Sequence, residues 1–500
     1  MFEQHTVTKA DYRKYRVLEM IPGIMVWSTF AITLALSFVR PIWAIYFIIA
    51  FDLYWLARII YMIFLMTLSY FKFKKTKRIN WKEKVQQLPH WREYKHLVFI
   101  PTYKEPYEVL HSTFIALANN DHPLDTFIVV LAGEEKDKGN FTRIADRLTQ
   151  EFGNKFFKFI VTLHPSGIAG EVAGKGANIA WAGKKAREFV DQVKIPYDKV
   201  IVSSFDSDTC VHHQYFTYLT YTYLTHPNPT KASYQPLALF GNNVWDSPAL
   251  TRVISFSTTF WLFGEQVRPE RMFTFSSHSM SFKTLVDVGF WQSDIVTEDS
   301  RICLQCMMEY DGDYEVVPLH LPVSMDVVLG ETFWQTMKAQ YIQQRRWAYG
   351  VENFPYMVWN FGRNKSMPLV KKIRYIFNQL EGVYSWGTAP ILIFMLGYLP
   401  VWVANLRGMT TVAAQNTPDI LQGLMTAAMV GIIIQAILST TLLPKRPKHK
   451  PRWRFLFMLL QWVLVPFTLI AFGSIPAIEA QTRLMLGKYL GFHVTEKVRK

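Results

Sequence analysis

Apolar residues are concentrated in four long stretches, two near each end of the chain. Residues 21–39 and 42–71 form the first pair, and Arg40-Pro41 interrupts the apolar run between them. Residues 383–404 and 420–443 form the second pair. A helix of about 20 apolar residues crosses the hydrocarbon core of a bilayer, so each stretch is long enough. The pattern predicts a membrane protein with four spanning helices.

A fifth apolar stretch, residues 455–472, has an ambiguous pattern. Pro466 lies inside it, Pro476 lies just beyond it, and the tail that follows is basic. If the stretch crossed the bilayer, the tail would lie outside, against the rule that keeps basic flanks in the cytoplasm. We therefore expect a re-entrant or interfacial helical hairpin, with a fifth spanning helix as the alternative.

Residues 95–330 have a different periodicity. Short β-branched and aromatic runs alternate with segments that predict helices; these runs are residues 97–101, 127–131, 157–163 and 199–202. Such alternation is typical of a doubly wound α/β fold with a parallel sheet. Residues 331–351 are amphipathic, rich in Trp, Gln and Arg, and too polar to span. They predict a helix that lies on the membrane face.

Basic residues cluster beside the apolar stretches. The formal net charge is +15, and the densest basic runs are residues 72–84, 371–374 and 445–454. Nucleic-acid binding would also account for a positive charge, but these positions follow the positive-inside pattern of membrane flanks. We expect a multi-pass protein of the plasma (inner) membrane, in contact with the lipid bilayer and with no nucleic acid. Residues 1–20 lack the pattern of a signal peptide.

The chain therefore divides into segments of alternating character. The predicted order is a cytoplasmic N-terminus (1–20), two spanning helices (21–71), a cytoplasmic α/β domain (72–330), interfacial helices (331–374), two more spanning helices (375–443), a basic loop with the fifth apolar segment (444–490) and a tail (491–500). Asp52 and Arg58 lie inside the second apolar stretch, six residues apart. That spacing does not suit an ion pair within one helix, and we assign these two residues no catalytic role.

Two carboxylates follow the fourth predicted strand. In Asp206-Ser207-Asp208 the acidic side chains are two residues apart and point to the same face at the carboxyl end of the strand. Ligands bind at that edge of open α/β sheets. Two carboxylates there suit a divalent cation, Mg²⁺ or Mn²⁺, that carries a diphosphate. A solvated turn is the alternative for this motif taken alone.

Three further motifs favour the functional reading. They are Thr297-Glu298-Asp299, Gln343-Gln344-Arg345-Arg346-Trp347 and, in the tail, Phe492-His493-Val494-Thr495-Glu496-Lys497. In this order the motifs D-x-D, T-E-D, Q-x-x-R-W and F-x-V-T-x-K resemble those of membrane-embedded family 2 glycosyltransferases, in particular the processive cellulose and hyaluronan synthases. The resemblance covers residues 95–350 and the tail. It implies an inverting glycosyltransferase whose α/β domain, a GT-A-like fold with a Rossmann-type mixed sheet, is inserted between transmembrane helices.

The resemblance assigns the donor site to three loops. Thr102, Tyr103 and Glu105 match the loop that lies against the nucleotide base. The family has an acidic D-D-G-like turn after the second strand; here Glu134 or Glu135 takes its place. Lys175 and Asn178 match the K-x-x-N segment, in which the lysine meets the diphosphate as a point charge. Asp206 would also contact the nucleotide sugar, and Asp208 is the expected direct metal ligand.

The same resemblance assigns the chemistry. Asp299 is the expected general base that takes the proton of the acceptor hydroxyl, and Glu298 supports its loop. Thr297 alternatively caps the helix that follows it. The acceptor pocket is expected at Ser276, Ser277 and His278, with a buried structural histidine as the alternative for His278.

The remaining motifs close the predicted site. Gln343, Arg346 and Trp347 share one helical face, where Arg346 would neutralise the leaving diphosphate and Trp347 would stack on the acceptor sugar. The alternative for this helix is a membrane-surface anchor with snorkelling arginines. Thr495 and Lys497 in the tail resemble the gating loop of cellulose synthase and would close over the bound nucleotide sugar.

Three functions remain open from the sequence. The favoured one extends a polysaccharide processively from a nucleotide-diphosphate sugar, a UDP-sugar above all, and passes the growing glycan across the membrane. The second transfers one sugar to a lipid-linked or short acceptor. The third is a catalytically degenerate membrane scaffold or transporter. The sequence does not identify the sugar, the linkage or any accessory subunit.

Overall fold

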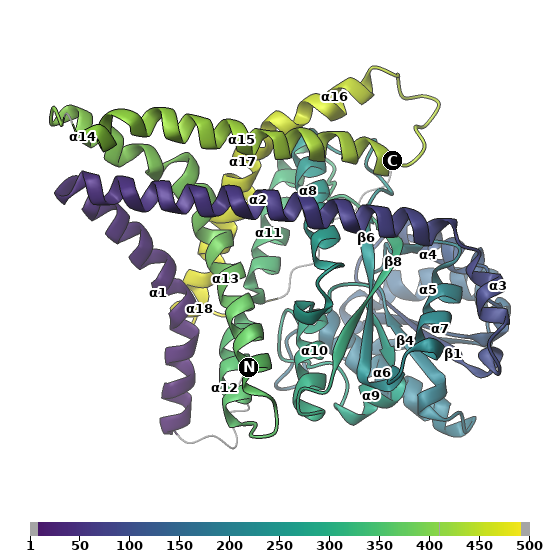
Figure 1. The fold of residues 1–500 in the computed structure, drawn as a ribbon. Coiled ribbons are helices and arrows are strands. Elements are labelled where there is room, and N and C mark those ends of the chain that lie inside the picture. Colours follow the sequence, from purple (N-terminus) through teal and green to yellow (C-terminus); the bar gives the residue numbers. More distant parts are fainter. Residues whose placement is uncertain (1–8, 410, 492–500) are drawn as a thin grey trace.

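The computed structural model describes residues 9–409 and 411–491 and contains one mixed eight-stranded sheet flanked by helices (Figure 1). The strands are β1 (Lys95–Pro101), β2 (Phe127–Glu134), β3 (Lys158–His164), β4 (Val200–Ser204), β5 (Cys210–Val211), β6 (Ala232–Phe240), β7 (Ser279–Ser281) and β8 (Glu315–Met325). Their order across the sheet is β3-β2-β1-β4-β7-β6-β8-β5.

The first half of the sheet is parallel, as predicted. Strand β1 pairs in parallel with both β2 and β4, and β2 pairs in parallel with β3. The second half is mixed, because β7 pairs antiparallel with β4 and β6, whereas β6 and β8 are parallel. The fold is therefore an α/β fold with a GT-A-like mixed sheet. The carboxyl ends of β1, β2, β3 and β4 meet at one edge of the sheet.

Helices cover both faces of the sheet. They are α3 (Trp81–Gln86), α4 (Tyr107–Ala118), α5 (Lys138–Phe152), α6 (Lys175–Gln192), α7 (Tyr215–Thr225), α8 (Ala249–Glu265), α9 (Phe282–Asp287) and α10 (Glu298–Glu309). Successive residues of a strand point to opposite faces. In β1, Val98 and Ile100 therefore pack in the core that contains α4, α5 and α7. Leu97 and Phe99 pack in the core that contains α6, α9 and α10.

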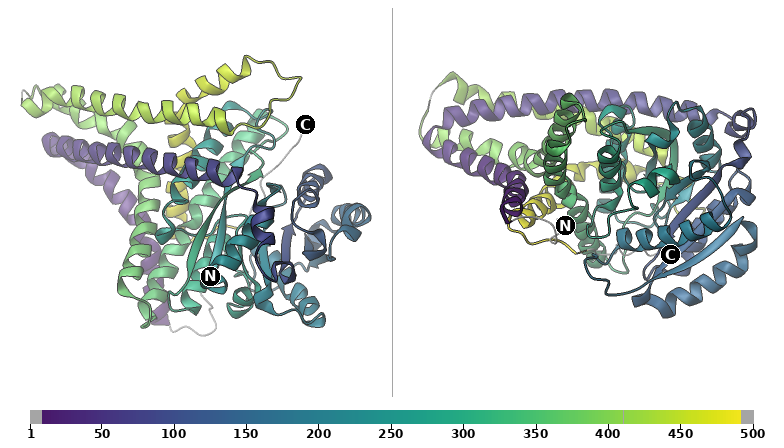
Figure 2. Two further views of the ribbon diagram at one scale, coloured as in Figure 1. Left: turned by 45° about the vertical axis from the view of Figure 1, so that its right-hand side comes forward. Right: turned by 90° about the horizontal axis from the view of Figure 1, so that it is seen from below.

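The apolar stretches form long helices beside this domain. They are α1 (Lys9–Val39), α2 (Pro41–Arg78), α13 (Leu369–Phe394), α14 (Leu399–Leu406) and α15 (Val412–Leu442). Helices α2 and α15 lie side by side, as Figures 1 and 2 show. In the described part of the chain, four helices are long and apolar enough to cross a membrane, or up to five if the bent pair α13–α14 is one span. The predicted third span is this bent pair, with an angle of 49° between its two helices.

The fifth apolar stretch differs from the prediction of a helical hairpin. Residues 454–485 form one helical run built from α16 (Arg454–Leu460), a 3₁₀ segment Gln461–Leu464, α17 (Val465–Thr468), a π-helical segment Leu469–Ser474 and α18 (Ile475–Met485). Proline is tolerated in the first turn of a helix, where its missing N–H is not needed. Pro466 and Pro476 each occupy such a position, at the starts of α17 and α18, so neither turns the chain back.

This run packs along the α/β domain and helix α11. Arg252 of α8 donates to Gln461 near its start at 2.8 Å, and Phe472 packs with Ile254 and Met337 at its middle. Near its end, Glu479 accepts hydrogen bonds from Tyr341 and Arg345, both at 2.7 Å. The last two donors belong to α11 (Phe333–Ala348), which α12 (Asn353–Arg363) follows.

Arg58 finds its partner on another helix. Its guanidinium pairs with Glu381 of α13 at 3.1 Å. The sequence spacing excluded a pair between Arg58 and Asp52 within α2, and the tertiary structure supplies a different carboxylate. The pair ties α2 to α13 beside the α/β domain.

Candidate active site

The loop after β1 is held together by Glu105. One carboxylate oxygen accepts from the Thr102 hydroxyl at 2.8 Å and from the Tyr103 amide at 2.5 Å. The other accepts from Ser207 Oγ at 3.0 Å, which joins this loop to the turn that carries Asp206 and Asp208. Thr102, Tyr103 and Glu105 all line the cavity described below. The bonds of Glu105 show that its carboxylate organises the loop. This is the loop that the sequence predicted to lie against the nucleotide base.

The two aspartates after β4 have different surroundings. Asp206 accepts from Lys175 Nζ at 2.6 Å and from Ser276 Oγ at 2.7 Å. Asp208 is almost fully buried and accepts from the Asp326 amide at 2.8 Å. Both aspartates line the cavity. The predicted motif therefore lies at the carboxyl edge of the sheet with both carboxylates held in place.

Lys175 begins α6 and faces three acidic groups. Besides its bond to Asp206, Nζ lies 3.9 Å from the Glu298 carboxylate. Burial alone would lower the pKa of Lys175, but the carboxylates of Asp206, Glu298 and Asp299 outweigh burial and raise it. The lysine is thus a permanent positive charge in the site. Asn178, one turn later, donates to the Ala132 carbonyl of β2 at 3.0 Å and lines the cavity.

Gly176 allows α6 to approach the acidic motif. A Cβ at this position would lie 3.0 Å from the Gln292 carbonyl oxygen and 3.0 Å from the Glu298 Cβ. Both contacts are tighter than ordinary van der Waals contact. The glycine therefore lets α6 lie close to the T-E-D motif; a Cβ at this position would require the neighbouring atoms to move by a few tenths of an ångström.

Glu298 and Asp299 start α10 at the cavity wall. Burial, together with the adjacent charge of Asp299, raises the pKa of Glu298. Burial also raises the pKa of Asp299, although Lys175 opposes the shift. A raised pKa makes a carboxylate a stronger base near neutral pH. Thr297 occupies the N-cap position as predicted, but its hydroxyl donates to Glu352 at 2.6 Å instead of capping the helix.

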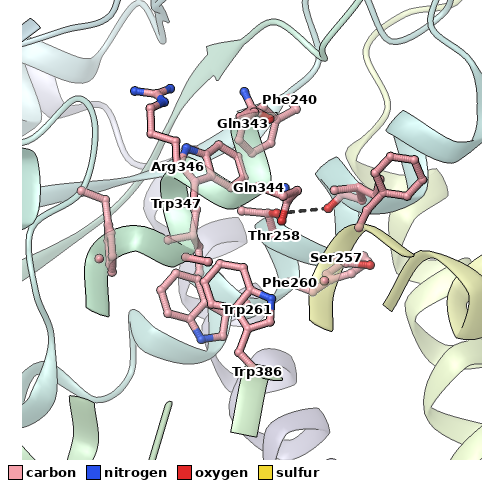
Figure 3. A pocket seen from close by; sticks show the side chains of 18 of the residues that line it. Phe240, Ser257, Thr258, Phe260, Trp261, Gln343, Gln344, Arg346, Trp347 and Trp386 are labelled. Carbon is pink, nitrogen blue, oxygen red and sulfur yellow. Dashed lines mark hydrogen bonds between the residues drawn. The ribbon is translucent and has the colours of Figure 1, made fainter. Parts of the chain in front are cut away.

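Helix α11 brings the Q-x-x-R-W side chains to the same cavity. Gln343 and Gln344 are buried, and Gln343 accepts from Gln340 at 3.2 Å. Arg346 and Trp347 line the cavity, and the Trp347 ring lies 6.2 Å from the Phe240 ring (Figure 3). The polar face of this amphipathic helix is thus turned toward the site, while Trp334 near its start is exposed.

The predicted acceptor residues separate in the structure. Ser276 lines the cavity and bonds Asp206. Ser277 and His278 are buried and do not line the cavity, which differs from the prediction that all three form the acceptor pocket. Ser277 bonds Thr209, and the His278 Nδ1 bonds the Phe275 carbonyl oxygen at 2.9 Å. Burial lowers the pKa of His278 to about 4, so it is a neutral structural histidine.

One cavity of about 1890 Å³ connects the site with the long apolar helices. At one end it is lined by Lys175, Asp206 and Asp299, and it continues to residues of α2, α13 and α15. Figure 3 shows the side chains of Trp261, Trp347 and Trp386 gathered around its middle section. The aromatic lining from α8 and α13 was not predicted, because the sequence did not show which tryptophans face one another.

Asp326 and Asn242 are further site residues that the sequence did not reveal. The Asn242 amide donates to the Asp208 carbonyl oxygen and to the Asp326 carboxylate, both at 2.9 Å. Asp326 follows β8 and its backbone amide holds the Asp208 carboxylate. These residues lie far from the motif in sequence. Strand β8 pairs with β5, which directly follows the motif, and with β6, which precedes Asn242, and these two pairings bring the residues to the motif.

The oxygen ligands that the site offers fit a divalent cation. Asp206 and Asp208 supply hard oxygen ligands, whereas no group of three or more His, Cys, Asp or Glu residues suited to a metal occurs within residues 9–409 and 411–491. A magnesium-type ion is commonly bound by one or two carboxylates together with substrate phosphates. The residues present therefore suit a metal that arrives with, and is completed by, a diphosphate.

Thr495 and Lys497 lie outside the described residues. The chain that leads to them ends close to the site, because Leu490 packs in a cluster with Val296, Ala348 and Tyr349. Val296 immediately precedes the T-E-D motif. On the other side, Arg16 of α1 donates to the carbonyl oxygens of Leu484 and Met485 at 3.1 and 2.9 Å.

The family model for glycosyl transferase family group 2 matches residues 201–475, more than half of the chain. The chain belongs to this family of glycosyltransferases. The match begins in β4, includes the D-x-D, T-E-D and Q-x-x-R-W motifs and extends into the long apolar helices. No curated relative matches the glycosyltransferase sequence.

Solved structures similar to this glycosyltransferase include a mannosyltransferase and the S. aureus protein TarS. The mannosyltransferase PcManGT from Pyrobaculum calidifontis, in complex with GDP-Man and Mn²⁺, is 14% identical; the match covers 85% of this chain and 99% of that one, with a TM-score of 0.41. Residues 1–349 of TarS from S. aureus with UDP-GlcNAc are 13% identical over 79% and 93% of the two chains, with a TM-score of 0.37. At these scores the similarity carries no argument about substrate or metal.

Proposed function

We propose that this glycosyltransferase extends a polysaccharide from a nucleotide-diphosphate sugar and passes the polymer across the membrane through its own helices. The observation that carries this proposal is the single cavity of about 1890 Å³ shared by the catalytic residues and the long apolar helices. Its far section is lined by residues such as Met62 of α2, Ile393 of α13 and Ala428 of α15. A product that remains in such a cavity after each transfer can be elongated again.

The donor is a nucleotide sugar, with UDP as the proposed nucleotide. Thr102, Tyr103 and Glu134 line the part of the cavity at the ends of β1 and β2, where the base binds. Lys175 holds the diphosphate. Asp206 and Asp208 would hold a divalent cation, which when bound would supply charge neutralisation to the leaving diphosphate. Arg346 on α11 adds a second fixed positive charge at the same cavity.

Asp299 is the proposed catalytic base. The acceptor hydroxyl oxygen attacks the anomeric carbon of the donor, the bond from that carbon to the diphosphate breaks, and the hydroxyl proton passes to Asp299. Such a direct displacement inverts the anomeric centre. The raised pKa of Asp299 supports this role, because a base that is too acidic holds the proton poorly.

The aromatic side chains in the cavity hold the growing glycan. Trp347, Trp261 and Trp386 present flat apolar faces, which suit the C–H-rich faces of sugar rings (Figure 3). The tail containing Thr495 and Lys497 closes over the donor from the cytoplasmic side. The packing of Leu490 beside Val296, which immediately precedes the T-E-D motif, supports this placement of the tail.

Membranes containing the protein, supplied with a panel of labelled nucleotide sugars, test the function. We expect one donor, a UDP-sugar, to enter a high-molecular-weight product that resists extraction into organic solvent. Incorporation of a single sugar into an organic-soluble lipid would overturn processive synthesis and identify the lipid-acceptor alternative. Absence of transfer and of donor hydrolysis with every nucleotide sugar would overturn the enzymatic proposal itself.

A further inference from the structure

His164 lies between two carboxylates at the edge of the donor site. It is the last residue of β3 and is 4% exposed. Its Nδ1 lies 3.0 Å from a Glu134 carboxylate oxygen, and its Nε2 lies 2.9 Å from a Glu171 carboxylate oxygen. Both ring nitrogens therefore have an acidic partner.

The two glutamates belong to different parts of the site. Glu134 is the last residue of β2 and lines the cavity where the base is proposed to bind. Glu171 lies in the loop of residues 165–174, which leads directly to Lys175. Gly167 and Gly170 give this loop two left-handed backbone positions. A bond from the Val172 amide to the Ser293 carbonyl oxygen at 2.9 Å secures its far end. His164 thus links the base side of the site to the diphosphate side.

The protonation state of His164 decides whether both links form. The imidazolium donates an N–H to each carboxylate, whereas neutral imidazole has one donor and presents a lone pair to the other carboxylate. The groups that face the ring are Glu134 from β2, Glu171 from the loop and the uncharged Trp181 ring of α6 at 6.1 Å. Burial alone would lower the pKa of His164, but the two glutamates outweigh burial and raise it.

We infer that His164 is a positioning residue that holds the Glu134 carboxylate toward the ring N–H of the nucleotide base and couples it to the Lys175 loop. This inference rests on the proposed function. A carboxylate accepts from the N3–H of uracil or the N1–H of guanine, whereas the matching ring nitrogens of cytosine and adenine are acceptors. The site therefore takes nucleotides whose base carries a ring N–H.

The pH dependence follows from the charged bridge. A group whose pKa is raised contributes its interaction fully below its ordinary pKa and loses it as the pH rises through the raised value. Nucleotide binding should therefore weaken as the pH rises through the pKa of His164. The mechanism is loss of one of the two charge-assisted hydrogen bonds, each of which is stronger than a neutral one.

Titration calorimetry on the purified full-length protein tests the inference, with UDP, GDP, CDP and ADP as probes in the presence of Mg²⁺ or Mn²⁺. We expect UDP or GDP to bind more tightly than CDP and ADP. His164→Gln should weaken binding about tenfold, the loss expected for a hydrogen bond to a charged group, and should abolish its pH dependence between about pH 6 and 8.5. His111→Gln is the matched control, because His111 bonds Glu151 on the outer surface and does not line the cavity.

Glu171→Gln keeps the shape of the loop and removes only the charge. Like His164→Gln, it should weaken nucleotide binding and reduce the dependence of the affinity on pH. If His164→Gln does not fold, Glu171→Gln tests the inference in its place. Unchanged affinity and an unchanged pH profile in either folded variant would overturn the inference. If wild-type protein bound none of the four diphosphates, the proposed function itself would fail, which is a different result.

Discussion

At the scale of single residues, the candidate site is a balance of buried charges. Lys175 faces Asp206 at 2.6 Å and Glu298 at 3.9 Å, with Asp299 adding a further negative charge. The carboxylates raise the pKa of Lys175 and keep it charged, whereas burial raises the pKa of Glu298 and of Asp299 in spite of the lysine. A substrate diphosphate would compete with Asp206 for Lys175, and a divalent cation would replace the lysine as partner of the aspartate. Binding of a diphosphate and a cation would therefore change the charge balance of Lys175 and Asp206.

Replacing the proposed base tests its role directly. Asp299→Asn should lower the transfer rate by about 10²–10⁴, the usual contribution of a general base, and leave nucleotide-sugar affinity nearly unchanged. In the wild type the rate should rise with pH through the raised pKa of Asp299 and then level off, because only the ionised carboxylate accepts the proton. Initial rates across pH and calorimetric donor binding measure both effects. An equal loss of donor binding in the variant would show that Asp299 belongs to the donor site.

Removing the metal ligand should affect a different step. Asp208→Asn should reduce transfer by about 10² or more, because a bound cation supplies several kcal/mol of charge stabilisation to the leaving diphosphate. Membrane insertion should remain intact, since the substitution preserves the size of a side chain that the Asp326 amide holds. Radiolabelled transfer with and without EDTA provides the measurement. Full wild-type activity in EDTA would contradict a metal requirement.

At the scale of elements, the end of α18 joins three parts of the molecule. Glu479 binds Tyr341 and Arg345 of α11, Arg16 of α1 holds the last carbonyl groups of the helix, and Tyr489 donates to Glu19 at 3.0 Å. Helix α11 also carries Gln343, Arg346 and Trp347. The end of α18, from which the chain continues to the tail, is therefore fixed to the helix that carries the Q-x-x-R-W motif. The chain up to Leu490, from which the tail continues, is therefore held by elements from both ends of the chain.

Deleting residues 491–500 should cut turnover severely while the protein still inserts into the membrane. The expected cause is loss of the segment that closes the site against water once the donor is bound. Steady-state transfer, compared with donor binding in the same detergent-purified sample, separates closure from folding. Normal turnover in the truncated protein would contradict a gating role for Thr495 and Lys497.

A separate labelling experiment tests on which side of the membrane the tail lies. A cysteine at Lys500 should resist a membrane-impermeant thiol reagent in intact cells and react after the membrane is permeabilised. This is expected because the tail is basic and because Leu490, just before it, packs beside Val296. Labelling from outside intact cells would contradict both the cytoplasmic tail and the gate.

At the scale of the whole molecule, the continuity of the cavity is the feature on which the proposed processive synthesis rests. Residues of the α/β domain and of four long helical segments share one lining, from Glu134 to residues of α15 and the run 454–485. A soluble transferase that releases each product has no need for a cavity that continues between apolar helices. The aromatic and polar lining near Trp261 and Gln343 gives way to an apolar one along α15.

A bulky residue on α15 should block this path. Ala428 lines the cavity, whereas its neighbour Ala427 is exposed and does not. Ala428→Trp should shorten or abolish the polymer, because the indole fills the path of the glycan, while donor binding is retained. Ala427→Trp is the matched control and should leave product length unchanged. Polymer of normal length from Ala428→Trp, measured on a sizing gel, would place the product elsewhere.

Local patterns in the sequence determined the elements and the order of the motifs. The strands β1, β2, β3 and β4, their parallel pairing and the positions of Asp206, Asp208 and Asp299 could be predicted. Side-chain periodicity and strand–helix alternation are properties of neighbouring residues. The four apolar stretches could also be predicted, because the thickness of the bilayer fixes the length of helix needed to cross it.

The tertiary structure alone decided which of these residues meet. It turned Ser277 and His278 into the core, made the run 454–485 one helix despite Pro466 and Pro476, and placed Asp326 against Asp208. It also joined Glu134, His164 and Glu171, of which the sequence singled out only the first as a candidate. These outcomes depend on contacts between distant segments, whose energies are set by packing and burial in the folded chain and leave no periodic trace in the sequence.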